Sequence, residues 1–236
     1  MMLSHEEQRE LWEKEHAEPY ALKQMDARKE SSSLPPFFEL LRSQKLTELS
    51  GIEMGCGKGR NSIWCAQQSE VATMTGFDFS SVAIEEAKRR AEEARVSAKT
   101  RFLVMDATTR WEFPDASFDF GLDCTASTDI ESPEGRAYAV SEMRRVLKPG
   151  GHFLVYVMST DDEYHKEMIA RSPAEEKYAF YHPDTGKFEK VFDESELDDM
   201  YTNFELVEAR RMNKKSVFFG KEYASKMHWR VYRKPA

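Results

Sequence analysis

Three glycines spaced two residues apart are the part of the sequence most suggestive of chemistry. The segment GIEMGCGKGRN, residues 51–61, places Gly55, Gly57 and Gly59 directly after a short apolar stretch. Glycine lets a backbone turn tightly and approach a ligand closely, and the free N–H groups of a following helix favour an anion. A dinucleotide loop would follow the pattern GxGxxG, but its third glycine position holds Arg60 here. The loop therefore predicts a cofactor site that is not of the NAD type.

Two aspartates end the next two apolar stretches. Asp78 follows the first glycine by 23 residues, where a carboxylate can accept hydrogen bonds from both hydroxyls of a ribose. Asp106 could accept a hydrogen bond from an adenine amino group, and Phe77, Phe79 and Met105 would line the adenine plane. The alternative is that Asp78 caps a helix and Asp106 lies in a turn beside core aromatic rings. We favour the ligand-binding interpretation because ligands of such folds lie at the carboxyl ends of strands.

Three side chains could act as a general base, should the reaction need one. Asp123 ends the fourth apolar stretch, Asp129 follows in the next loop, and His182 lies beside an aromatic cluster at 178–181. Each of these residue types is more often a surface or capping residue than a catalyst. The cysteines and histidines show no ligand-like spacing, so we expect no metal.

Strand-like and helix-like stretches alternate along the middle of the chain, which is typical of a parallel sheet with helices on both faces. The pattern predicts strands over residues 49–54, 71–78, 101–106, 118–123 and 152–158, and helices over residues 58–68, 80–95 and 132–147. The motif KPGG at 148–151 would end the last of these helices.

The flanking regions are less regular. The sequence predicts a charged surface helix or lid over residues 4–18, a helix over 31–46, a short helix over 193–201, and strands over 204–211, 216–219 and 228–233. Residues 160–190 break the alternation. Trp12 and Tyr20 could form a lid over a ligand, although simple helix packing would explain them equally well.

Composition limits the possible partners. The chain has 236 residues and a net charge of −8, which suits one domain and disfavours a nucleic acid as the main partner. We interpret the seven basic residues after Met212 as a solvated face rather than a functional patch. The charged N-terminus, the absence of a long apolar run and three free thiols predict a cytoplasmic protein that does not bind membranes.

Five motifs taken in order resemble those of the class I S-adenosylmethionine-dependent methyltransferases. They are EMGCGKG (53–59), GFD (76–78), MDA (105–107), SFDF (117–120) and RVLKPGG (145–151). The resemblance covers about residues 34–160 by motif and extends more loosely to 233; the loop GKGRNSIW is also similar, more weakly, to the tellurite-resistance and small-molecule branch. The resemblance to the class I methyltransferases implies an α/β fold that is Rossmann-like and doubly wound. Its sheet would have seven mostly parallel strands with an antiparallel last strand, and helices would cover both faces.

The resemblance also implies S-adenosyl-L-methionine as the cofactor and a role for each matching residue. The glycine loop with Glu53 and Asn61 would hold the methionine end, and Asp78 the ribose. Phe79, Asp106 and Ala107 would hold the adenine. Asp123 or Cys124 would face the methyl group. The reaction would be an in-line displacement, in which alignment of the reacting atoms provides much of the acceleration.

By this resemblance the whole chain, 1–236, is a single methyltransferase domain. Its parts would be an N-terminal lid (1–33), a cofactor-binding core (34–159), a substrate-side insertion (160–192), and a C-terminal helix with strands (193–236). The first strand departs from the family pattern, with Ser50 and Gly51 where bulky residues are expected.

The methyl acceptor remains open at this stage. We expect a small molecule, with protein lysine or N-terminal methylation as the alternative because LDCTASTD (122–129) is distantly similar to a segment of a lysine-methylating group. The lack of an NPPY-like motif after the fourth strand disfavours the amino-methylating nucleic-acid enzymes. A NAD(P) oxidoreductase and a non-catalytic cofactor binder are weaker alternatives, and no oligomeric state is predicted.

Overall fold

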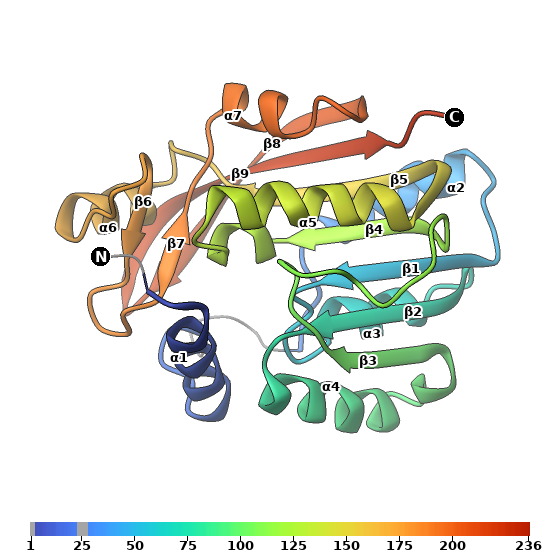
Figure 1. The fold of residues 1–236 in the computed structure, drawn as a ribbon, viewed down its shortest axis with the longest axis horizontal. Coiled ribbons are helices and arrows are strands. Elements are labelled where there is room, and N and C mark those ends of the chain that lie inside the picture. Colours follow the sequence, from blue (N-terminus) through green and yellow to red (C-terminus); the bar gives the residue numbers. More distant parts are fainter. Residues whose placement is uncertain (1–2, 23–27) are drawn as a thin grey trace.

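A seven-stranded sheet forms the centre of the molecule (Figure 1). The structure is a computed structural model that describes residues 3–22 and 28–236. The strand order is β3-β2-β1-β4-β5-β9-β8. The strands are β1 (Leu49–Met54), β2 (Val71–Asp78), β3 (Thr100–Val104), β4 (Phe118–Cys124), β5 (Leu147–Met158), β8 (Glu205–Phe218) and β9 (Lys221–Arg233).

Strands β1 to β5 are parallel, and β9 is antiparallel to both of its neighbours, β5 and β8. The predicted Rossmann-like sheet with an antiparallel last strand is therefore confirmed. The strand order reverses at β1, whose neighbours are β2 on one side and β4 on the other. In open α/β sheets this reversal leaves a crevice beyond the carboxyl ends of the strands.

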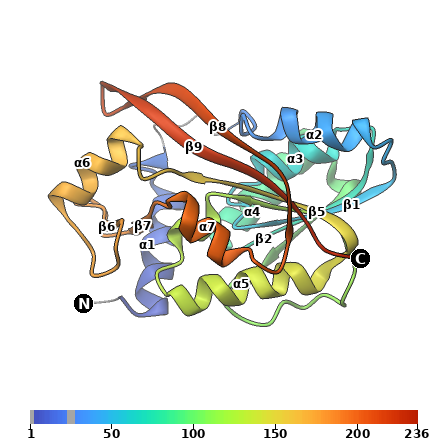
Figure 2. The ribbon, with the colours of Figure 1, turned by 90° about the horizontal axis from the view of Figure 1, so that it is seen from above.

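Helices cover both faces of the sheet (Figure 2). Helices α2 (Leu34–Ser43), α3 (Arg60–Ala66) and α4 (Ser81–Glu93) belong to one apolar cluster, whereas α5 (Pro133–Val146) and α7 (Glu194–Met200) belong to the other. Serine side chains start α4 and α5, because Ser80 and Ser132 each accept a hydrogen bond from a backbone N–H of the first turn. The predicted starts of these two helices agree with the structure.

A helix and a small unit lie beyond the carboxyl ends of the strands. Figure 1 shows α1 (His5–Ala17) beside the ends of β1, β2 and β3, with α6 (Glu163–Arg171), β6 (Ala179–Tyr181) and β7 (Phe188–Lys190) on the same side. Thus the predicted N-terminal helix is present, and the irregular segment 160–190 contains a helix and a hairpin that the sequence did not indicate.

The prediction of three separate strands at the C-terminal end was wrong. The three expected strands form two long ones, β8 and β9, which turn at Phe219 and Gly220. Most residues of β8 are exposed. Because neither face of this strand is buried, its sequence lacks the alternation of apolar and polar residues that marks a half-buried strand. Helix α5 ends at Val146, just before the KPGG segment as predicted, but the next strand, β5, begins at Leu147 rather than at residue 152.

Most of the basic side chains near the C-terminus form ion pairs. The pairs are Lys215–Glu222, Lys221–Glu167, Arg230–Asp198 and Arg233–Glu205. Such pairing leaves little unbalanced positive charge on the hairpin. In the part of the chain that the structure describes, no helix is long and apolar enough to cross a membrane.

Candidate functional site

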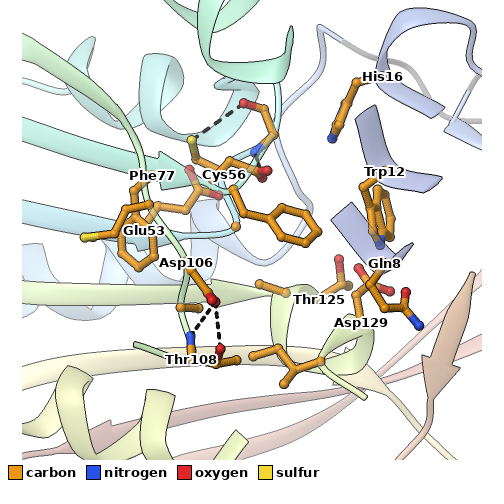
Figure 3. Close-up of a pocket in the computed structure, with 18 of the residues that line it drawn as sticks. Gln8, Trp12, His16, Glu53, Cys56, Phe77, Asp106, Thr108, Thr125 and Asp129 are labelled. Carbon is orange, nitrogen blue, oxygen red and sulfur yellow. Dashed lines mark hydrogen bonds between the residues drawn. The ribbon is translucent and has the colours of Figure 1, made fainter. Parts of the chain in front are cut away.

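A cavity of about 690 Å³ lies where the strand order reverses. Its walls come from the residues after β1 to β4 on one side and from α1 on the other, as Figure 3 shows for Glu53, Asp106, Trp12 and His16. Cavities of this size hold drug-sized ligands. The fold thus brings the predicted strand-end residues together with a helix that is distant in sequence.

The glycine loop forms one wall of the cavity. Gly55 has φ +60° and Gly57 has φ +50°, in the left-handed region that favours glycine. A β-carbon on Gly55 would lie 2.4 Å from that of Ala126, so the position has no room for a side chain. Gly59, predicted to contact the cofactor, is not among the cavity-lining residues and instead precedes α3, where it packs beside Phe102.

Asp78 joins the glycine loop to the start of α4. Its Oδ2 accepts a hydrogen bond from the backbone N–H of Gly57 at 2.8 Å, and its Oδ1 accepts one from Ser80 at 2.9 Å. Burial raises the pKa of Asp78 to about 6, although these two N–H groups oppose the rise. The side chain lines the cavity and holds Ser80, whose own side chain caps α4, so Asp78 supports the helix start without capping the helix itself.

Glu53 is a buried carboxylate beneath the loop. It accepts hydrogen bonds from Asn61 Nδ2 at 2.8 Å and from Ser62 Oγ at 2.5 Å. Burial raises its pKa to about 7, and the two hydrogen bonds moderate the rise. Glu53 and Asn61 both line the cavity, so a cationic group entering there would meet a carboxylate that becomes fully ionised only above neutral pH.

Asp106 lines the cavity together with Phe79 and Ala107. Its Oδ1 accepts hydrogen bonds from the N–H and hydroxyl of Thr108, both at 2.8 Å. Its Oδ2 lies 2.9 Å from Nε2 of His5 on α1. The predicted adenine-binding residues are therefore close together, and α1 reaches them directly.

The three candidate bases differ in location. Asp129 lines the cavity, and burial together with the nearby Glu189 raises its pKa well above the usual range. Asp123 is fully buried in the sheet and does not line the cavity; its Oδ1 accepts the N–H of Ser127. His182 also lies outside the cavity lining, and its Nε2 is 3.0 Å from the hydroxyl of Tyr164. The geometry thus favours Asp129 over the other two.

Helix α1 is attached to the core by charged contacts. The carboxylate of Glu13 lies at the start of α4, where it accepts hydrogen bonds of 2.7–3.1 Å from Ser80 Oγ, Ser81 N, Ser81 Oγ and Val82 N. A carboxylate at a helix N-terminus is favoured by the helix dipole. The structure therefore places α1 across the cavity as a docked wall.

Sequence reasoning missed three of the four cavity residues on α1. His5, Gln8, Trp12 and His16 all line the cavity, but only Trp12 was singled out, and Tyr20 is absent from the lining. The missed signal was the spacing of three or four residues, which places all four on one face of a helix. Tyr20 packs against Phe219 instead, with ring centroids 5.1 Å apart.

Comparison with known proteins points to one family. Residues 52–151 match the family described as "Methyltransferase domain". A demethylmenaquinone methyltransferase of Leptospira interrogans is 31% identical over 103 residues, 44% of this chain and 40% of that protein. A sterol 24-C-methyltransferase of Gibberella zeae is 34% identical over 48% of this chain and 28% of that protein. The match thus spans less than half the length of these curated relatives.

Solved structures extend the similarity to nearly the whole fold. A S-adenosylmethionine-dependent methyltransferase of Methanosarcina mazei has a TM-score of 0.71 and 25% identity, and the match covers 83% of this chain and 97% of that one. The 1,6-didemethyltoxoflavin-N1-methyltransferase of Burkholderia thailandensis, solved with bound 1,6-didemethyltoxoflavin and S-adenosylhomocysteine, has a TM-score of 0.68 and 16% identity, and the match covers 100% of this chain and 92% of that one. Residues 52–151 therefore match a methyltransferase domain, and the chain shares the fold of S-adenosylmethionine-dependent methyltransferases.

Proposed function

We propose that this protein transfers the methyl group of S-adenosylmethionine to a small-molecule acceptor. The observation that carries the proposal is that the glycine loop, Glu53, Asp78 and Asp106 line one cavity at the carboxyl edge of the sheet. The sulfonium of the bound cofactor would supply an electrophilic methyl group. The protein's contribution to the reaction would be to bind, orient and shield the reacting groups.

The residues present fit this cofactor. Gly55 and Gly57 leave backbone beside the cavity without side chains. The carboxylate of Glu53 would hold an amino group, and that of Asp78 would accept hydrogen bonds from ribose hydroxyls. Asp106 would accept a hydrogen bond from an adenine amino group. These three carboxylates come from the ends of three different strands, so the fold itself sets their spacing.

Asp129 is the residue that we propose as a general base for the acceptor. It lines the cavity just beyond the end of β4. Its raised pKa would make it a stronger proton acceptor once ionised than an exposed aspartate. A base in this position would remove the proton that an acceptor hydroxyl or ammonium must lose.

Two observations support a small acceptor over a protein side chain. Helix α1 forms a wall of the cavity, and its Glu13 is hydrogen-bonded to the start of α4. In addition, the relatives from Leptospira interrogans and Gibberella zeae are named for small molecules, demethylmenaquinone and a sterol.

Transfer of a radiolabelled methyl group tests the proposal. Purified protein and labelled S-adenosylmethionine are incubated with a cell extract, and the products are then separated by size. We expect label among small molecules, and none with Asp78→Ala. Label confined to protein bands would contradict the small-molecule acceptor.

Two variants then test the base. Asp129→Asn should lower the transfer rate at least about 100-fold, the lower end of general-base effects. His182→Gln should change it by no more than about two-fold, because His182 is outside the cavity lining. An equal loss in both variants would contradict the assignment of Asp129.

A further inference from the structure

One face of α1 presents polar atoms that the described residues leave unsatisfied. The side-chain oxygen of Gln8, the indole nitrogen of Trp12 and Nδ1 of His16 are buried and have no hydrogen-bond partner in residues 3–22 and 28–236. The three residues are spaced four apart on the helix and all line the cavity, and Figure 3 shows them along one side of it. Buried polar groups without partners are rare in folded proteins, so their position indicates a ligand.

These three groups are uncharged. An amide oxygen and an indole nitrogen carry no formal charge. Burial and the nearby Lys58 lower the pKa of His16 to about 4, so its imidazole is neutral at pH 7. The helix therefore offers one acceptor, one donor and one neutral imidazole, which suit a neutral hydrogen-bonding partner.

The charges beside Gln8 and Trp12 are already satisfied within the protein. Glu131 accepts hydrogen bonds from Gln8 Nε2 at 2.6 Å and from the hydroxyl of Tyr181. Lys187 lies 3.8 Å from a carboxylate oxygen of Glu15 and 3.8 Å from the centroid of the Trp12 ring. An anionic acceptor would lose its hydration there without gaining a free cation, and a cationic one would have to compete with the neutral donors that already bind Glu131, which is costly.

Asp129 belongs to the same cavity lining. Burial and the nearby Glu189 hold its pKa well above the usual range, so its surroundings disfavour the charged carboxylate. The cations of the cavity lining, Lys58 and Arg60, belong to the glycine loop, and Lys58 lies near His16.

Apolar and aromatic residues also line the cavity. They include Leu3, Leu22, Ile130 and the ring of Trp12, whose centroid lies 5.8 Å from that of His16. Aromatic side chains pack favourably against flat rings.

From these features, and resting on the proposed function, we infer that the methyl acceptor is an uncharged aromatic molecule with a hydroxyl or carbonyl group. The N–H of Trp12 donates a hydrogen bond to it, and the side-chain oxygen of Gln8 accepts one from it. Lys187 is a positioning residue that holds the Trp12 ring. His16 lies next to Gly57, because a β-carbon there would be 3.5 Å from Cε1 of His16, so it borders both the cofactor and the acceptor.

Matched probes of one shape and different charge test this inference. Protein saturated with S-adenosylhomocysteine is titrated calorimetrically at pH 7 with 2-naphthol, 2-naphthoate and 2-naphthylmethylammonium. We expect 2-naphthol to bind, and each charged probe to bind at least about ten-fold more weakly because its charge would be buried unpaired. Trp12→Phe keeps the ring but removes the N–H, and it should weaken 2-naphthol binding about five-fold, the effect of one neutral hydrogen bond.

Trp64→Phe is the control, because Trp64 lies on α3 outside the cavity lining; it should leave all affinities unchanged. Binding of S-adenosylhomocysteine itself should be the same in both variants. The inference is overturned if 2-naphthol does not bind, if a charged probe binds as tightly, or if Trp12→Phe has no effect. Failure of S-adenosylhomocysteine to bind the wild type would instead overturn the proposed function, and this inference with it.

Discussion

Because the pKa values of Glu53 and Asp78 are raised, we expect opposite pH dependences for the free energy of unfolding and for the affinity of the cofactor. Burial raises the pKa of Glu53 to about 7 and that of Asp78 to about 6, above their values in an unfolded chain. Between about pH 4 and pH 7 the folded, ligand-free protein therefore binds more protons than the unfolded chain, and its free energy of unfolding falls as the pH rises. A cofactor amino group pairs with the ionised form of Glu53, so affinity should rise over the same window.

The size of the effect follows from the pKa of Glu53. At pH 5 this carboxyl lies about two pKa units below its midpoint, and ionising it costs about 3 kcal/mol at about 1.4 kcal/mol per unit. Binding of S-adenosylhomocysteine should thus be on the order of 100-fold weaker at pH 5 than at pH 8. Asp78, with the lower pKa, contributes less to this difference.

Calorimetric titration with S-adenosylhomocysteine between pH 5 and pH 8 measures this dependence. Titrations in two buffers with different ionisation enthalpies should also detect about one proton released per ligand near pH 6. Glu53→Gln should remove most of the slope, and Glu70→Gln, at a carboxylate paired with Arg42 outside the cavity, should retain it. A wild-type dissociation constant that varies less than about three-fold over this range would refute the reasoning.

Three further predictions concern the parts that shape the cavity. Gly55→Ala should lower the free energy of unfolding by about 2–4 kcal/mol, because the strain of a left-handed backbone adds to a 2.4 Å clash. Gly150→Ala, at φ +78° in open space, should lower it by about 1 kcal/mol. Equal losses of the two variants in urea unfolding would contradict this. Lys187→Met and Glu15→Gln should be coupled by about 1–3 kcal/mol in a double-mutant cycle, because the pair is buried at 3.8 Å; additive effects would show that the pair does not hold α1. Glu13→Gln should speed hydrogen exchange in α1, since its carboxylate accepts four hydrogen bonds at the start of α4, and unchanged exchange would argue against docking of α1 through this residue.

Local motifs made the central sheet and one half of the site predictable. Glu53 and Asp78 lie in the last two residues of β1 and β2, and the glycine loop and Asp106 follow β1 and β3. The carboxyl ends of parallel strands meet at one edge of the sheet. The sequence alone therefore sufficed to bring these residues together. Asp78 has a structural contact as well as a place in the cavity lining, because one carboxylate oxygen accepts the N–H of Gly57 and the other that of Ser80.

Long-range contacts made the other half unpredictable. Gln8 lines the cavity because α1 docks against Glu131, a residue 123 positions away, and no local pattern encodes such a contact. His182 was misleading for the same reason. Its aromatic neighbours suggested a pocket, but the ring lies between Tyr164 and Tyr20, outside the lining.

Binding of S-adenosylhomocysteine compared with NADH tests the central claim most directly. Both ligands are titrated into the wild type and into Asp78→Ala at pH 8, where Glu53 and Asp78 are largely ionised. The structure predicts one S-adenosylhomocysteine bound per chain and no binding of NADH. The affinity of Asp78→Ala for S-adenosylhomocysteine should be at least about ten-fold lower, because the variant loses a charged hydrogen-bonding group. Binding of NADH alone would contradict the assignment of this cavity to S-adenosylmethionine.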